Sequence, residues 1–304
     1  MLARKSERRP IHGWLIVNKT AGHTSSAVVQ KLKWVLNAQK AGHAGTLDPD
    51  ASGILAIALG EATKTIPYLT NDLKGYIFTV SLGTSTNTDD ATGDIIDKSS
   101  IRPTNHEIQE ACKTFLGNIK QVPPIFSAVK VNGQRAYKMA RMGAKNLNLV
   151  ARDLWVEELK ILERTDKNNV IMKLVCGKGG YVRSLARDLG RNLGCFAHIA
   201  TLKRVSSGPF SLSKSLSDKF IFSENVAKIK DSILPVDSAL KNLHRFECTI
   251  EEANDINNGK AIDINFSLVR GADIFVSYKT TPIAIGQIVQ HKFYPKKVFR
   301  LLLE

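Results

Sequence analysis

Hydrophobic and polar positions follow two different periods along the chain, and most of the predicted elements follow from them. WLIVN (residues 14–18) and ILAIALG (54–60) are short and almost continuously apolar, which is typical of buried strands. In KGYIFTVSLG (74–83) every second residue from Tyr76 to Leu82 is apolar. This alternation predicts a half-buried strand with Tyr76 near its start.

Three other stretches show the period of an amphipathic helix. Residues 24–39 place their apolar side chains on one stripe, and Ser25 or Ser26 is the predicted N-cap. Residues 104–117 begin with a threonine and a glutamate at capping-box spacing and end at a glycine. Residues 179–194 present one apolar face and also end at a glycine, so they are predicted to form a second strong helix.

Further apolar runs predict a strand around residues 125–131 and a hairpin that joins 154–162 to 169–177, whereas residues 84–94 are predicted to form a polar loop. The strands occur as hairpin-like runs rather than in strict alternation with helices. The predicted fold class is therefore α+β (mixed α/β), with a central, largely antiparallel sheet flanked by helices.

The pattern changes beyond the first predicted domain, which we assign to residues 12–235. A short capped helix within 249–260 is followed by alternating segments at 273–279 and 283–290. These elements fit into roughly sixty residues, a size that a separate small module can have. We therefore expect residues 245–304 to form a small β-rich C-terminal domain.

The charge balance of the chain changes this picture from a general fold to a class of partner. The 304 residues include 43 Lys and Arg but only 28 Asp and Glu, which gives a net charge of +15 at pH 7 and a pI near 9.7. Such a surplus favours a nucleic-acid partner, although a merely soluble basic surface would give the same count. No apolar run approaches the ~20 residues of a spanning helix, so a membrane partner is disfavoured.

The termini and the cysteines indicate a reducing compartment. Residues 1–11 are basic and lack a following apolar core, so we expect a short disordered arm rather than a secretory signal. The four cysteines are widely scattered and the histidines do not cluster, which argues against a disulfide framework and a zinc site. A cytoplasmic protein fits these features best.

The candidate chemistry begins with a glycine-rich loop, AGHAGTLDPDASGILAIALG at residues 41–60. It lacks the GxGxxG and GxxxxGK[ST] patterns of phosphate-binding loops. Asp48 precedes Pro49, which favours an extended conformation at Asp48, and the glycines allow a bulky substrate to approach the backbone. In isolation, such a loop is more often a turn whose aspartate caps a neighbouring N–H group.

The helix over residues 179–194 offers a possible partner for this aspartate. Arg183, Arg187 and Arg191 are spaced four residues apart on the face opposite the apolar stripe, so a solvated basic stripe is the default interpretation. Arg183, however, lies in the first turn directly after GKGGY, where its guanidinium could turn inward. An arginine buried against Asp48 would hold that carboxylate in its charged form.

Four segments occur together in the order and spacing seen in one known family: GHAGTLDPDASGIL, KGYIFTVSLGTSTNTDDATGD, QVPPIFSAVKVNGQRAYKMAR and GGYVRSLARDLGRNLGCFAHIATLKR. The chain thus resembles the TruB family, the tRNA pseudouridine synthases that act on uridine 55 in the T arm. The resemblance covers residues 12 to about 210 and, more loosely, the tail, which is similar to the PUA-type RNA-binding module. It implies a pseudouridine synthase-like catalytic domain that needs neither a metal nor another cofactor.

The resemblance also implies roles for individual residues. Asp48 matches the essential aspartate of the family, and Arg183 matches the arginine that pairs with it. Tyr76 matches the tyrosine that stacks on the flipped uracil and is a candidate to take the C5 proton. Asp48 could bond covalently to the sugar, attack the base or abstract a ribose proton. The reaction requires extrusion of the nucleotide from its stack.

Four further residues are implied to bind the substrate. Tyr181 and Leu202 match residues that line the uracil pocket. His43 resembles the side chain that stacks in the gap left by the flipped nucleotide, and Lys19 matches the lysine of the first motif of the family. The tRNA T arm is the expected partner, and no obligatory protein partner is expected.

The sequence departs from the family pattern at three positions: Thr20 replaces the proline of the first motif, Asp50 replaces an apolar residue, and Phe126 replaces a tyrosine. None of them is one of the implied catalytic residues, and Thr20 and Phe126 are the departures that affect the outer substrate contacts. Two alternatives remain: a catalytically silent RNA-binding or scaffold protein, and a guide-dependent enzyme of the same fold. The intact catalytic residues disfavour the first alternative, and the short tail disfavours the second. The basic surplus is expected to be shared between the catalytic face and tail residues Lys260, Arg270, Lys279, Lys292, Lys296 and Lys297.

Overall fold

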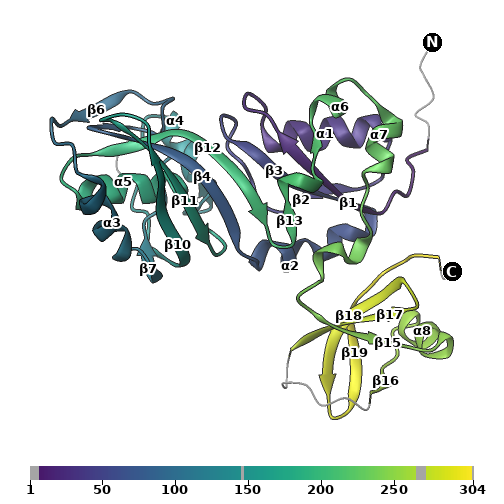
Figure 1. Ribbon diagram of the computed structural model, residues 1–304. Helices are drawn as coiled ribbons and strands as arrows, with labels where there is room; N and C mark the ends of the chain where they lie inside the picture. Colours follow the sequence, from purple (N-terminus) through teal and green to yellow (C-terminus); the bar gives the residue numbers. More distant parts are fainter. Residues whose placement is uncertain (1–6, 145–146, 265–271, 303–304) are drawn as a thin grey trace.

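The apolar runs of the sequence lie side by side in one large sheet (Figure 1). The computed structural model describes residues 7–144, 147–264 and 272–302. The strands follow the order β14 (Leu216–Ser217), β1 (Gly13–Lys19), β3 (Ser52–Leu59), β12 (Ala197–Ser207), β4 (Lys74–Leu82), β11 (Asn169–Cys176), β10 (Arg152–Arg164) and β7 (Gly117–Gln121), with β2 (Ala41–His43) beside β3 and β13 (Phe210–Ser211) beside β12.

Most neighbouring strands of this sheet are antiparallel, and the two parallel pairs are β1 with β14 and β3 with β12. The predicted α+β class with a largely antiparallel sheet is confirmed. Helices and 3-10 turns connect the strands. They are α1 (Ser25–Val35), η1 (Gly60–Thr65), α2 (Ile66–Asn71), α3 (Asn105–Lys113), α4 (Ala136–Arg141), α5 (Val182–Asn192), η2 (Leu212–Lys214), α6 (Lys219–Phe222), α7 (Val226–Asp231) and η3 (Val236–Ala239).

Apolar clusters cover the two halves of the sheet. One cluster packs α3 and α5 against β4, β10 and β11, and another packs α1, α6 and α7 against β1 and β3. The predicted apolar stripes of α1 and α5 thus face the sheet. β12 and β4 run between the two halves, so side chains on these strands reach the boundary where both clusters meet (Figure 1).

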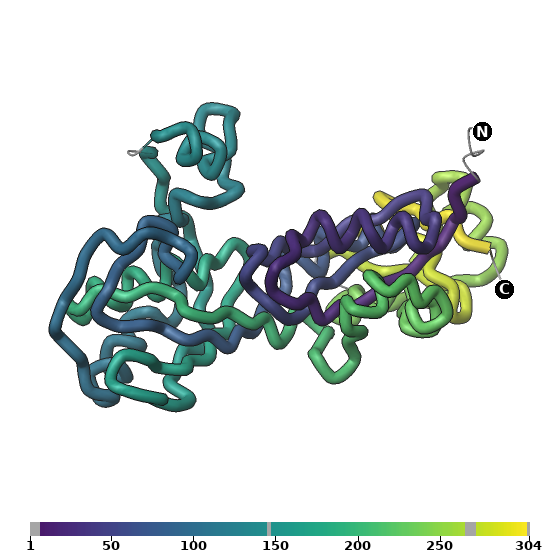
Figure 2. Tube along the Cα trace, turned by 90° about the horizontal axis from the view of Figure 1, so that it is seen from above, coloured from purple at the N-terminus to yellow at the C-terminus, as the bar shows by residue number. Residues whose placement is uncertain are grey.

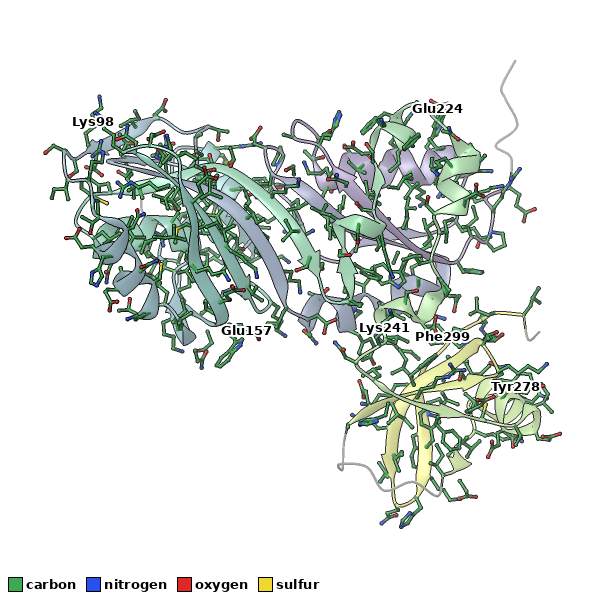
Figure 3. All side chains as sticks on the ribbon, viewed as in Figure 1. Lys98, Glu157, Glu224, Lys241, Tyr278 and Phe299 are labelled. Carbon is green, nitrogen blue, oxygen red and sulfur yellow. The ribbon has the colours of Figure 1, made fainter. Side chains whose placement is uncertain are left out.

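Residues 244–264 and 272–298 form a second sheet with its own helix, α8 (Ile250–Asn257). Its strands follow the order β15 (His244–Glu247), β17 (Asp273–Tyr278), β18 (Thr281–Val289), β19 (Lys292–Val298) and β16 (Ile262–Asp263). The side chains of Phe275, Ile285 and Phe299 do not pack in this sheet's own core. They pack in a cluster that also contains Trp14 and Leu240. Figure 3 shows Phe299 on the side that faces the large sheet. The two units therefore share a core.

Several local predictions were wrong. Thr24 caps α1 by accepting from Ala27 N, and Ser25 is instead buried. Residues 84–94 begin with a strand, β5 (Thr84–Thr86), which pairs with β6 (Ile95–Lys98).

The segment predicted as a strand at 125–131 contains only β8 (Lys130–Val131), which pairs with β9 (Gln134–Arg135). Residues 123–144, drawn in teal, stand away from the body in Figure 2. A strand so far from the large sheet finds only the short partner within its own hairpin.

The N-terminal arm predicted for residues 1–11 falls partly outside the described residues. Its described end is ordered, because Arg9 N donates to Asn37 O at 2.7 Å and Gln39 N donates to Arg9 O at 3.0 Å. The prediction of a disordered arm is therefore wrong for this part. Among the helices of the described ranges, none is long and apolar enough to cross a membrane.

Candidate active site

The loop that carries Asp48 joins β2 to β3 and is held from two sides. Ser25 Oγ donates to Leu47 O and accepts from Leu47 N, both at 2.8 Å. Gly22 N and Lys19 Nζ donate to Pro49 O, each at 2.9 Å. The residues on either side of Asp48 are thus fixed, while the Asp48 side chain itself remains 42% exposed.

Arg183 reaches this carboxylate from the first turn of α5. Its Nε lies 2.9 Å from Asp48 Oδ2, and its side chain is only 7% exposed. The other guanidinium nitrogens donate to Thr88 O and Phe126 O, both at 3.1 Å, and Nη1 lies 3.7 Å from Asp90 Oδ2. One buried cation therefore ties the Asp48 loop to two further loops of the protein.

The solvated basic stripe predicted for α5 is wrong for two of its three arginines. Arg187 is 12% exposed and lies 3.0 Å from Asp89 Oδ2, next to the Arg183 contacts. Only Arg191, at 66% exposure, faces solvent. The N-terminal end of α5 thus lies beneath the loops that Arg183 contacts rather than at the surface.

Tyr76 lies on β4, one of the central strands, between Arg204 of β12 and Leu174 of β11. It is 8% exposed. Burial raises the pKa of the phenol, while the nearby Arg204 guanidinium opposes this effect and the Asp48 carboxylate adds slightly to it. Tyr76 and Asp48 are therefore electrostatic neighbours, and the resting phenol keeps its proton.

The structure places the other three pocket candidates around the same loops. Leu202 lies on β12 opposite Phe78 and packs against both apolar clusters. Tyr181 immediately precedes α5, and its backbone N–H and C=O both bond to the Gln121 side chain. His43 ends β2, and burial together with the Arg204 charge lowers its pKa, so its ring is neutral at pH 7.

Lys19 has a different environment from that of a substrate-contacting lysine. It is fully buried, and its ammonium donates to Thr20 O, His23 O and Pro49 O at 2.8–2.9 Å. Burial lowers its pKa, although Asp218 and the aspartates of the loop partly offset this. This placement favours a positioning role beneath the Asp48 loop.

Thr20 shows how the chain accommodates one departure from the family pattern. Its N–H donates to Asp218 Oδ2 at 2.7 Å and its hydroxyl donates to the same oxygen at 2.9 Å. A proline could make neither bond. Asp218 is 1% exposed, so these two bonds satisfy a buried carboxylate.

Arg204, Asp90 and Gln121 also contribute to the site and were not predicted from the sequence. Arg204 is 2% exposed and two residues from Leu202 on the same strand, so it shares a sheet face with a predicted pocket residue. The alternation of side chains along this strand was therefore the sequence signal for placing Arg204 beside the pocket. In the described ranges no group of three His, Cys, Asp or Glu residues could hold a metal ion, and all four cysteines are free and buried.

Comparisons with known proteins point to one family. Residues 33–182 match the model of the TruB family pseudouridylate synthase N-terminal domain, and residues 183–241 match that of the tRNA pseudouridylate synthase B C-terminal domain. The chain is 49% identical to tRNA pseudouridine synthase B of Ruegeria pomeroyi over 98% of its own length and 99% of the relative. It is also 49% identical to the enzyme of that name from Cereibacter sphaeroides, over 99% and 100% of the two chains.

Solved structures show the same fold. A Cbf5–Nop10–Gar1 complex contains a chain with a TM-score of 0.72 and 26% identity, with 94% of this chain and 84% of that chain covered. An H/ACA RNP bound to a substrate RNA containing 2'-deoxyuridine gives a TM-score of 0.73 at 23% identity, with 95% and 85% covered.

Proposed function

The chain belongs to the TruB family of pseudouridylate synthases, and we propose that it converts uridine 55 in the T arm of tRNA into pseudouridine. The observation that carries this proposal is the pair of Asp48 and Arg183, 2.9 Å apart. The arginine is buried, whereas the aspartate is partly exposed and can meet a ligand. The names of the full-length relatives support tRNA as the substrate.

The proposed reaction is an isomerisation in which the C1′–N1 bond breaks and a C1′–C5 bond forms. A proton leaves C5 and N1 gains one, so no electron donor or acceptor is required. Asp48 is the group that acts on the sugar or the base, and Arg183 orients it through its fixed contacts. Tyr76, on β4, is the proposed stacking partner of the uracil and the acceptor of the C5 proton.

We propose that the flipped uracil lies between Tyr76, Tyr181 and Leu202. A target base inside a folded T arm must leave its stack before its C1′ atom can be reached. The neutral ring of His43 suits a stacking contact in the gap left behind, since an uncharged imidazole offers an aromatic face without attracting phosphate.

The proposal also covers the domains of the chain, its partners and its cellular compartment. We assign catalysis to residues 12–235 and a PUA-like RNA-binding role to residues 245–304, and residues 236–240 lie in the core that the two units share. The curated relatives match the chain over nearly their whole length, which supports an enzyme that acts without a guide RNA or a protein partner. Four buried thiols support a reducing cytoplasm.

The test uses tRNA that carries tritium at C5 of uridine. Loss of the C5 proton releases the label to water, and we expect release at a yield of one per tRNA. The control substrate has cytidine at position 55 and tritium only at its other uridines, and it should release no label. The Asp48→Asn variant should bind tRNA within about threefold of the wild type, since most affinity rests on phosphate contacts, and should lose at least roughly a thousandfold in rate. Binding without any release by the wild type would instead indicate a silent RNA-binding protein.

A further inference from the structure

Arg204 is a buried arginine whose guanidinium donates to backbone carbonyls. It is 2% exposed. Its Nε donates to Ile54 O at 2.7 Å, Nη2 donates to Gly45 O at 3.0 Å, and Nη1 lies 3.4 Å from Thr46 O. Among the described residues, no ion pair within 4.0 Å includes this guanidinium.

These contacts connect both ends of the loop that carries Asp48. Gly45 and Thr46 precede the aspartate and Ile54 follows it, so one side chain bridges the loop at its base. The Arg204 backbone pairs with Gly53, which adopts a φ of +97°, and a Cβ atom there would lie 2.1 Å from Arg204 O. The loop therefore closes directly on this residue.

The same guanidinium is the dominant cation near Tyr76. The two residues are cross-strand neighbours, and the Arg204 charge lowers the pKa of the Tyr76 phenol against the larger effect of burial. The other titratable groups near this guanidinium or the phenol are His43, Lys74, Cys176 and Asp48. Burial and then the Arg204 charge lower the pKa of both His43 and Lys74, so His43 carries no positive charge beside the phenol at pH 7.

A buried guanidinium without a paired carboxylate is costly, because its desolvation is offset only by carbonyl dipoles. Simple loop closure could use a neutral donor. The charge itself therefore points to a function at the neighbouring catalytic groups.

We propose that Arg204 is a positioning residue for the reaction, which fixes the Asp48 loop and supplies the positive charge beside the Tyr76 hydroxyl while that hydroxyl exchanges protons with the uracil ring. The role of Tyr76 rests on the proposed function. The exchange balances when the phenol gives its proton to N1 and then accepts the proton that leaves C5. The transient phenolate is stabilised by Arg204, and no other reactant is needed.

The first measurement reports on the charge and needs no RNA. 3,5-Difluorotyrosine is placed at position 76 alone, and its ionisation is followed by 19F NMR as the pH rises. In Arg204→Met we expect the residue at position 76 to ionise at a higher pH than in the parent protein. Arg204→Gln should give the same shift and replaces Arg204→Met if that variant does not fold. Arg204→Lys should stay near the parent. The matched control is Arg102→Met, which removes an arginine that also bonds three protein oxygens but lies between β6 and α3.

The second measurement is the single-turnover rate with natural Tyr76 and saturating tRNA. We expect Arg204→Met to lose at least roughly a hundredfold, Arg204→Lys about tenfold and Arg102→Met nothing, with tRNA affinity unchanged in all three because Arg204 is buried. Unchanged Tyr76 ionisation in Arg204→Met and Arg204→Gln would overturn the proposed charge role, and a wild-type rate would overturn the whole proposal. An inactive wild type with a shifted Tyr76 titration would refute the proposed function alone.

Discussion

At the scale of single residues, the site is built from buried cations that hold backbone carbonyls. Lys19, Arg183 and Arg204 are all buried, and between them they donate to carbonyls of the Asp48 loop and its neighbours. None of them needs to touch the substrate to matter. The loop's conformation depends on charges that water would otherwise solvate.

Arg183→Met tests this dependence through stability. The change removes the partner of Asp48 and leaves Thr88 O and Phe126 O without a donor. Breaking a fully buried pair costs about 3–5 kcal/mol, but Asp48 is partly exposed and water can solvate it, so we expect about 2–3 kcal/mol. Urea unfolding measures the loss.

The matched control is Arg191→Met on the same helix, where a 66% exposed side chain should change the free energy of unfolding by less than about 0.5 kcal/mol. Equal stability of the two variants would place Arg183 among ordinary surface arginines.

The predicted site could be reached from the sequence only as far as local signals allowed. Asp48 stood out through its proline and glycines, and Arg183 through the glycines before its helix. Arg204 had only the weaker signal of sharing a sheet face with Leu202, because an arginine in a strand usually faces solvent. Its burial follows from the sheet order, in which β12 pairs with β3 at one end and with β4 along its length.

At the scale of elements, helix ends give the sharpest comparison between sequence and structure. The capping box predicted at the start of α3 is present, with Thr104 and Glu107 bonded reciprocally. At α1 the pattern offered three adjacent hydroxyl residues, and the choice of cap depended on tertiary contacts. Ser25 is used by Leu47, so Thr24 caps the helix.

Thr24→Ala should therefore destabilise the protein by about 1 kcal/mol, since Ala27 N loses its acceptor at the helix N-terminus. Ser26→Ala is the control, because Ser26 is exposed and should have almost no effect. Thermal unfolding of both variants measures the difference. A larger loss for Ser26→Ala would show that the cap is misassigned.

The junction of α2 and β4 should give a pH-dependent stability. Lys74 is buried there and donates to Leu69 O, Thr70 O and Asp72 O. Burial, followed by the Arg204 charge, lowers the pKa of Lys74 to about 8 from 10.5. Between these values the unfolded chain binds more protons than the folded chain, so the stability rises as pH increases from 8 to 10.5.

The measurement is the free energy of unfolding of wild type and Lys74→Met at pH 7.5, 9 and 10. The wild type should gain stability relative to the variant across this range, whatever the offset at pH 7.5. A constant difference would mean that Lys74 titrates alike in both states.

At the scale of the whole molecule, the second unit is tied to the first by apolar packing and by polar contacts. Tyr68 Oη donates to Asp273 Oδ2 at 2.9 Å, and Lys297 Nζ donates to Lys64 O at 2.8 Å. A chain that ended near residue 235 would lose Val236 and Leu240 from the shared core. Truncation there would test folding rather than RNA binding, so charge substitutions are the better probe.

The expected sharing of the basic surplus with the tail is wrong. Residues 244–304 contain eight Lys and Arg against seven Asp and Glu, so they carry only one of the fifteen surplus charges. Three of the tail lysines form ion pairs within the second unit, namely Lys260 with Asp255, Lys292 with Asp263 and Lys296 with Asp273. Arg270 lies outside the described residues. The surplus belongs almost entirely to residues 1–243.

Residues 123–144 are the part of that first unit best placed to use the surplus. They project from the body (Figure 2), contain four basic and no acidic residues, and contact the site where Phe126 O accepts from Arg183. Lys130, Arg135 and Lys138 are exposed on this projection. Phosphates of a T arm bound over Asp48 would lie beside them, and each contact would release condensed counterions.

A salt titration of tRNA binding decides between the projection and the tail. The first variant carries Gln at Lys130, Arg135 and Lys138, and the second, with the same change in net charge, carries Gln at Lys260, Lys292 and Lys296. We expect the slope of log K against log salt to flatten by roughly two to three units in the first variant and by less than about one in the second, because the tail lysines already have acidic partners. Single-turnover rates at saturating tRNA should remain close to the wild type in both. A flatter slope in the tail variant alone would move the main phosphate contact to the second unit.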